Sequence, residues 1–427
     1  MSGSGTSDTA LARLQALARR LRLPTFVKTL TPTMAALALQ LAAFVITARG
    51  LGASAFGIYT SILAVSLIAN ELIGLGANDV MMRATARDHA AFPKYFGHML
   101  SMTALTFVPA VLICAAIITG PLRVDLAFGW VALALTAEMI AARVVNTLDA
   151  IMVAHGDTVR SGLLRLQGAL VRVVAAVTYF GILGQESIAG WISTVTVIAA
   201  VLTLYTWHVC VRQYGRPQRW FAHAEIVDGM LLGLPQLAFM LLCNVDRVAL
   251  ARFVPYAEVG AYGAASRAMQ IGLFPLQVGT RITYPQFFAP ENSGARRGLR
   301  FALKVSGPML ALGLLSQALV VGVSYTIPFI FGQGFASAQP ILVVLAISLP
   351  LTGLVTPAAD VLTALNRQGL RAACYLVVAV LFVGAALQAA QWQGALGVAW
   401  AYVGALALLA VAVWACVLVL ARREARS

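Results

Sequence analysis

Long apolar runs without charged residues constrain this chain more than any other feature. The stretches 100–118 and 372–390, for example, contain no Asp, Glu, Lys or Arg. A helix of about 20 such residues crosses the hydrocarbon core of a bilayer, which is about 30 Å thick. Apolar and polar residues do not alternate in these runs, as the strands of a membrane barrel require. The runs therefore predict an all-α polytopic membrane protein.

The composition excludes an ordinary water-soluble domain. Hydrophobic residues make up 60% of the chain and charged residues 11%, against about 45–50% and about 25% in a typical soluble domain. The formal net charge of +14 does not indicate nucleic acid as a partner, because the basic residues cluster in short connectors between apolar runs. Such a distribution is typical of membrane topology signals.

Hydropathy and charge together predict about twelve transmembrane helices with both termini in the cytoplasm. Most Lys and Arg residues lie in every second connector and in the two tails, and basic connectors stay on the cytoplasmic side. The basic segment 11–28 is predicted to lie along that surface as an amphipathic helix, with a disordered tail as the alternative. The spans are predicted at residues 30–49, 56–79, 97–119, 126–149, 163–184, 188–210, 228–250, 259–288, 304–325, 339–365, 372–391 and 395–420.

A weak internal repeat relates the two halves of the chain. The matched residues are Arg49, Gly57 and Tyr59 with Arg252, Gly260 and Tyr262, and Asp149 and Arg160 with Asp360 and Arg371. Repeats of this kind are common in transporters. The predicted organisation is a cytoplasmic basic segment (1–28), an N-lobe of six spans (29–211), a cytoplasmic connector (212–227), a C-lobe of six spans (228–421) and a cytoplasmic tail (422–427).

Three local patterns resemble a known family. They are ITARGLGASAFGIYTSILAV (46–65), NVDRVALARFVPYAEVGAYGAASRAMQ (244–270) and IPFIFGQGFASAQPILVVLA (327–346). They are similar to the polysaccharide transporter branch of the multidrug, oligosaccharidyl-lipid and polysaccharide exporter superfamily, which includes the O-antigen flippases. The resemblance implies that the protein moves an undecaprenyl-pyrophosphate-linked oligosaccharide across the bacterial inner membrane by alternating access, for O-antigen or exopolysaccharide synthesis.

Arginines within the spans are the candidate substrate-binding residues. Charges there are energetically costly and usually face the protein interior, and the guanidinium fork suits phosphate oxygens. The candidates for a cationic cavity are Arg267, Arg172, Arg143 and Arg247. Two alternative roles remain open, namely an internal ion pair such as Asp246 with Arg267, and snorkelling of Arg247 toward the membrane surface.

Five acidic residues in or near the spans are candidates for ion coupling or gating. They are Glu71, Glu138, Asp246, Asp149 and Asp360. An embedded carboxylate can take up a proton or a sodium ion during a transport cycle. For Glu71 and Glu138 the alternative is a structural role, as partners of Arg143 or of nearby hydroxyl groups. The equivalent positions of Asp149 and Asp360 indicate a structural role in capping or in gating toward the cytoplasm.

Prolines near the start of the second half suggest places where helices bend. Pro235 and Pro275 lie close to Gly233 and Gly272. Proline removes a backbone hydrogen bond and loosens the helix around it. Bending at these positions is predicted to open and close a cavity.

The sequence predicts a secondary transporter and no enzyme. It has no Gly-rich phosphate loop for ATP hydrolysis and no metal-ligand cluster, so no cofactor is expected beyond a proton or sodium ion for coupling. The expected partners are a lipid-linked oligosaccharide, membrane lipids, and a polysaccharide polymerase with other assembly proteins. The rival functions are a cation-coupled drug exporter, a scaffold that does not transport, and a membrane enzyme of polysaccharide assembly.

Overall fold

Helices form every regular element in the described part of the chain. The structure is a computed structural model that describes residues 23–424, where it contains no strand. The predicted surface helix over 11–28 lies outside the described residues, apart from residues 23–28. The main helices are α2 (Leu23–Leu72), α3 (Ala77–Arg87), α4 (Phe92–Thr119), α5 (Phe128–Ala154), α6 (Thr158–Ala176), α7 (Ile188–Tyr214), α8 (Ala224–Phe253), α9 (Tyr256–Thr283), α10 (Ala295–Ser324), α11 (Ile327–Phe331), α12 (Ala338–Ala346), α13 (Ser348–Ala364) and α14 (Gln368–Glu424).

Twelve membrane spans follow from these helices. Nine helical segments of the described chain are long and apolar enough to cross a membrane. Two of them, α2 and α14, turn sharply at Gly52 (φ 72°) and Gly394 (φ 63°), and each supplies two spans. The less apolar α9 supplies the remaining one with its 28 residues. The predicted all-α fold of twelve spans is therefore confirmed, and glycine is required at both turns because it adopts positive φ without strain.

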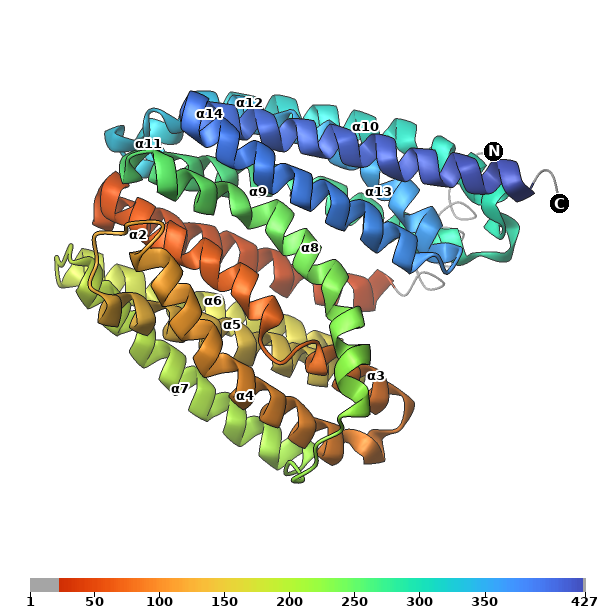
Figure 1. Cartoon of the computed structure of the whole chain (residues 1–427), viewed down its shortest axis with the longest axis horizontal. Coiled ribbons are helices and arrows are strands. Elements are labelled where there is room, and N and C mark those ends of the chain that lie inside the picture. The colour runs from red at the N-terminus through yellow and green to blue at the C-terminus, as the bar shows by residue number, and fades with distance from the viewer. Residues whose placement is uncertain (1–22, 425–427) are drawn as a thin grey trace, which may run out of the picture.

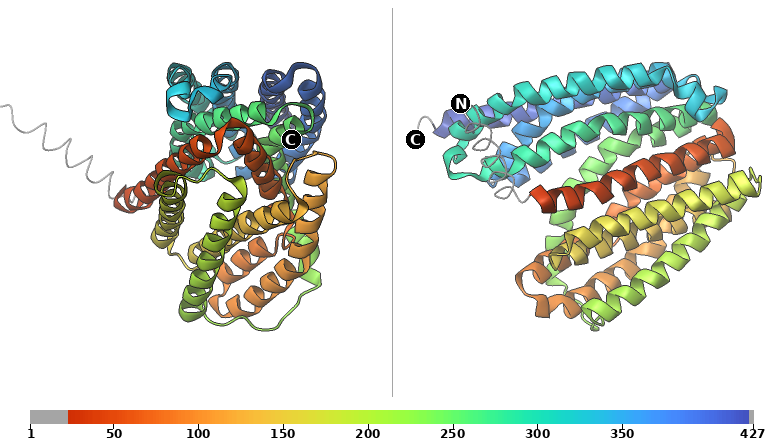
Figure 2. Two further views of the ribbon diagram at one scale, coloured as in Figure 1. Left: turned by 90° about the vertical axis from the view of Figure 1, so that its left-hand side faces the viewer. Right: turned by 180° about the vertical axis from the view of Figure 1, so that it is seen from behind.

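The spans form two six-helix lobes (Figure 1). Helices α2 to α7 make the N-lobe, and α8 to α14 make the C-lobe. The lobes meet where α2 turns and α9 begins, and their ribbons diverge toward the end where α2 starts and α14 ends (Figure 1, Figure 2). At the meeting point a β-carbon on Gly57 would lie 1.8 Å from the carbonyl oxygen of Tyr256, and one on Gly260 would lie 2.3 Å from that of Ala53. The repeated glycines thus form a close seam between the lobes.

An aromatic cluster fills the same end of the molecule. The ring of Phe44 lies 4.8 Å from that of Phe56 and 6.4 Å from that of Phe331, both edge to face. Phe335 packs on Phe56 with the ring centres 5.7 Å apart. These contacts join α2 to α11 and to the short helix η5 (Gln333–Phe335). The buried core therefore runs continuously from one lobe into the other at this end.

The second span ends earlier than its predicted limit at residue 79. Gly74, Leu75 and Gly76 all adopt positive φ, at 75°, 46° and 73°. Three consecutive left-handed residues cannot continue a right-handed helix, so α2 stops at Leu72 and α3 starts at Ala77.

The first turns of α8 contact the N-lobe, although the rest of the helix belongs to the C-lobe. A β-carbon on Gly76 would lie 1.9 Å from the carbonyl oxygen of Gly229. Arg83 of α3 lies 3.7 Å from Glu225 and 3.2 Å from Asp228. Helix α8 is thus the physical link between the lobes, and Pro235 lies within it.

Candidate substrate cavity

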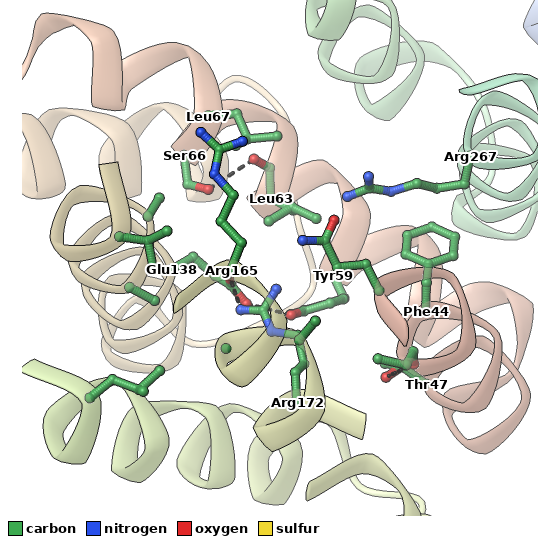
Figure 3. Close-up of a pocket in the computed structure, with 18 of the residues that line it drawn as sticks. Phe44, Thr47, Tyr59, Leu63, Ser66, Leu67, Glu138, Arg165, Arg172 and Arg267 are labelled. Carbon is green, nitrogen blue, oxygen red and sulfur yellow. Dashed lines mark hydrogen bonds and ion pairs between the residues drawn. The ribbon is translucent and has the colours of Figure 1, made fainter. Parts of the chain in front are cut away.

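A central cavity of about 250 Å³ lies in the N-lobe wall that faces the C-lobe. Helices α2, α5, α6 and α7 line it, and Arg267 reaches into it from α9 (Figure 3). Its charged lining residues are Glu138, Arg165, Arg172 and Arg267. The cavity therefore has three cationic side chains and one anionic side chain, and the cations come from both lobes.

Arg172 is neutralised by Glu138. Its Nη2 lies 2.8 Å from Oε2 of Glu138, whose side chain is 5% exposed. The hydroxyl of Tyr59 donates a hydrogen bond to the other carboxylate oxygen. The Arg172 side chain stays 36% exposed to the cavity. Two predicted site residues, Glu138 and Arg172, are thus brought together as an ion pair.

Arg165 also lines the cavity, and sequence reasoning assigned it only to a connector. Its Nη2 lies 2.6 Å from Oδ2 of Asp149, whose other oxygen accepts a hydrogen bond from Ser161. A signal was present in the sequence, because Arg165 and Arg172 are seven residues apart and share one face of a helix. Gly168 lies between them on the cavity wall.

Arg267 is the cavity arginine without an anionic partner. Among residues 23–424 no carboxylate oxygen lies within 4.0 Å of its guanidinium. Its Nη1 donates to Oε1 of Gln270 at 2.9 Å, and the group lies over the Phe44 ring at 5.1 Å. Its Nε is buried without a hydrogen-bond partner. Figure 3 shows the guanidinium pointing into the cavity above Phe44.

Asp246 and Arg247 lie inside the C-lobe, and neither of them lines the described cavities. Oδ2 of Asp246 accepts a hydrogen bond from the Tyr262 hydroxyl at 2.8 Å, and Oδ1 accepts one from the Arg247 backbone at 2.8 Å. An ion pair between Asp246 and Arg267, the alternative from the sequence, is not formed. Tyr262 is the repeat partner of Tyr59, so each repeated tyrosine donates to a buried carboxylate of its own lobe.

Arg143 and Glu71 line a second, wider cavity between the lobes. It measures about 570 Å³, and α2, α3 and α5 of the N-lobe face α8 and Gln368 across it. Asp79 and Asp149 also line it, and burial raises the pKa of the Asp79 carboxyl while the nearby Arg143 guanidinium lowers it. Asn146 lines both cavities. The inter-lobe cavity and the central cavity therefore adjoin at Asn146.

The second set of repeated residues, Asp149 and Arg160 with Asp360 and Arg371, forms different contacts in the two lobes. Asp149 pairs with Arg165, and Arg160 lies 3.2 Å from Asp157 instead. In the C-lobe the Oδ2 atom of the buried Asp360 has no hydrogen-bond partner. Among residues 23–424 no group of three or more His, Cys, Asp or Glu side chains is placed to hold a metal ion.

Two six-helix lobes around a polar cavity define the class of this protein as a multi-pass membrane protein with a transporter fold. Among solved structures, the chain is similar to a multidrug resistance MATE family transporter of the MOP superfamily in an inward-facing conformation. The TM-score is 0.75 at 17% identity, over 94% of this chain and 99% of that chain. The chain is also similar to an outward-facing multidrug resistance MATE family transporter of the MOP superfamily, with a TM-score of 0.59 at 18% identity over 93% of this chain and 95% of that chain. Identities this low show the fold alone.

The family follows from the sequence comparison. The family model described as polysaccharide biosynthesis protein matches residues 27–289, and the chain belongs to this family. It is also 30% identical over 250 residues to the teichuronic acid biosynthesis protein TuaB of Bacillus subtilis (strain 168). That match covers 54% of this chain and half the length of the relative. The resemblance to polysaccharide transporters is thereby confirmed.

Proposed function

We propose that this protein is a flippase of the bacterial inner membrane. Its substrate is an undecaprenyl-pyrophosphate-linked oligosaccharide, which it moves from the inner to the outer leaflet for polysaccharide biosynthesis. The family membership and the likeness to a teichuronic acid biosynthesis protein support the polysaccharide. The MATE fold supports transport rather than enzymatic catalysis.

The observation that carries this proposal is the unpaired guanidinium of Arg267 in the central cavity. A buried charge without a counter-ion is energetically unfavourable, so an anion that enters is attracted to it. A pyrophosphate carries about two negative charges at neutral pH and accepts paired hydrogen bonds from arginine. An organic cation, the substrate of the rival drug exporter, would be repelled by the unpaired Arg267.

Pyrophosphate in this cavity would contact both lobes. Arg267 belongs to the C-lobe, whereas Arg172 and Arg165 belong to the N-lobe. An anion that bridges these arginines binds more tightly to the conformation in which they lie close together. This difference in affinity between conformations shifts the equilibrium toward that conformation. Substrate binding is thus coupled to the relative position of the lobes, as alternating access requires.

Glu138 is the best placed of the candidate coupling residues. When pyrophosphate draws Arg172 away, the Glu138 carboxylate loses its counter-ion and becomes a site for a proton or sodium ion. Glu71, Asp246, Asp149 and Asp360 remain candidates for coupling or gating. The polymerase and other assembly proteins remain proposed partners.

Accumulation of lipid-linked oligosaccharide in cells that lack the protein tests the proposal. We expect the intermediate to collect on the cytoplasmic side, and the wild type to restore its export. Arg267→Gln should restore little, whereas Arg281→Gln, which alters an exposed arginine of the same helix, should restore fully. Mass spectrometry of extracted lipids measures the amount, and a membrane-impermeant sugar oxidant reports the side. No accumulation would favour a drug exporter, a scaffold or an enzyme.

A further inference from the structure

An apolar groove of about 470 Å³ runs along the N-lobe, lined by α4, α5 and α7. Helices α4 and α7 form its walls, with residues such as Leu100, Ala104 and Val108 on one side and Trp207 on the other. Val108 is 59% exposed and Trp207 is 47% exposed. In a span these side chains face the hydrocarbon of the bilayer, so the groove is open to lipid.

Arg143 lies at the junction of this groove and the polar cavity between the lobes, because it lines both. Its guanidinium lies against Gly74, where a β-carbon would be 2.2 Å from Nη2. Nη2 donates a hydrogen bond of 3.4 Å to Thr103, and Nε is buried without a partner. Among residues 23–424 no carboxylate oxygen lies within 4.0 Å of it. The guanidinium therefore has no direct carboxylate partner, although Glu71 and Asp79 line the same inter-lobe cavity.

We infer that the groove between α4, α5 and α7 holds the polyprenyl chain of the lipid-linked substrate as it enters, while Arg143 binds its phosphate before the pyrophosphate reaches Arg267 in the central cavity. A cation between an apolar groove and a polar cavity is complementary to an amphiphile with an anionic head. This assignment rests on the proposed flippase function and adds the path of the lipid chain. The sugar then extends from Arg143 toward the wider, polar cavity.

The position of Arg143 distinguishes this ligand from an ordinary membrane phospholipid. Arg143 lies eleven residues before Ala154, the end of α5, which is about 16 Å along the helix axis. A resting phospholipid keeps its phosphate at the membrane surface. A phosphate on Arg143 lies further along α5 than one held at the end of the helix, as the headgroup of a lipid must when it is flipped.

The test is photo-crosslinking of the purified full-length protein in nanodiscs. The probe is undecaprenyl phosphate with a diazirine in its isoprenoid chain, and the competitor is unlabelled phosphatidylglycerol. We expect labelled peptides from α4, α5 and α7. Ala104→Trp, which fills the groove, should abolish this labelling, and Leu112→Trp, on the lipid-exposed side of the same helix outside the groove, should not. Arg143→Gln should reduce labelling about tenfold, as expected for one lost charge-assisted contact.

Two results would overturn the inference. One is labelling that phosphatidylglycerol displaces as well as unlabelled undecaprenyl phosphate does, because the groove would then hold bulk lipid. The other is labelling elsewhere that Ala104→Trp leaves unchanged. The export assay separates this failure from failure of the flippase proposal. Export that survives Ala104→Trp but not Arg267→Gln refutes the assignment of the lipid chain to the groove and leaves the flippase proposal intact. Labelling of the groove, without accumulation of the intermediate in cells that lack the protein, refutes the flippase proposal and leaves the lipid-binding groove intact.

Discussion

The three arginines of the central cavity differ in what neutralises them. Glu138 pairs with Arg172 and Asp149 pairs with Arg165, whereas Arg267 has only the amide of Gln270 and the face of Phe44. Loss of one partner from a buried ion pair leaves the other charge uncompensated. At the residue scale, the pairing of Arg172 with Glu138 therefore sets both the stability of the cavity wall and its charge.

Glu138→Gln is expected to lower the thermal stability of the purified protein. A hydrogen bond to a charged group contributes about 1.5–3 kcal/mol, and the loss should lie at the lower end because the cavity partly solvates Arg172. Tyr59→Phe removes one hydroxyl donor to the same carboxylate and should cost about 1.5 kcal/mol. Unfolding in detergent, followed by tryptophan fluorescence, measures both changes.

The double variant Glu138→Gln with Arg172→Gln tests whether the pair acts as a unit. It should be more stable than the sum of the two single effects predicts, because no unpaired charge remains. Strictly additive effects would contradict the ion pair as the source of stability.

At the scale of elements, α8 is the helix that both lobes share. Its first turns are held to α3 by Arg83 and by the close contact of Gly76 with Gly229, and its remainder packs in the C-lobe. Pro235 lies between the two parts, where it removes one backbone hydrogen bond. A bend at this residue would change the angle between the part of α8 that is held to α3 and the part that packs in the C-lobe.

Pro235→Ala is expected to raise thermal stability and to slow export. Proline in a helix interior costs about 3 kcal/mol relative to alanine, and the restored hydrogen bond stiffens the link between the lobes. Pro308→Ala is the control, because Pro308 is an exposed proline inside α10 of the C-lobe. It should stabilise without slowing export. Equal export rates for both variants would show that α8 does not bend during transport.

At the scale of the whole molecule, the two lobes touch through glycine. Gly57 and Gly260 have no room for a β-carbon, since each lies against backbone atoms of the other lobe. Small residues allow helices in membranes to approach closely and gain dispersion contacts. The seam keeps the lobes together at this end while they diverge at the other (Figure 1).

Gly57→Ala is expected to push the lobes apart at the seam. Spin labels at positions 123 and 392, one exposed site in each lobe, should show a longer distance than in the wild type. Gly404→Ala is the control, because a β-carbon there meets no atom within 4 Å. In a helix the change from glycine to alanine alone stabilises by about 1 kcal/mol, so a loss of stability confined to Gly57→Ala would be due to the seam. An unchanged distance in Gly57→Ala would contradict this role.

The sequence by itself determined the number of spans and the division into two lobes. The length and hydropathy of an apolar run are local properties of the sequence, so they identify a span independently of the helices that pack against it. The repeat of Gly57 at Gly260 and of Tyr59 at Tyr262 indicated the division before any contact was known. Predicted spans that adjoin one another, such as 372–391 and 395–420, became one helix with a turn at Gly394.

Only the tertiary structure decided which charges meet. The rotation of each helix about its axis depends on partners far away in the chain, so the sequence named Glu138 and Arg172 without showing that they pair. It placed Arg165 in a connector, although the packing of α6 on α2 turns that side chain into the cavity. It grouped Arg143 with Arg267, whereas the fold places Arg143 beside an apolar groove and leaves Arg267 unpaired in the centre. Contacts between helices that are distant in the sequence decide which charged side chains pair and which face a cavity. Hydropathy along the chain does not specify which neighbour each side of a helix packs against.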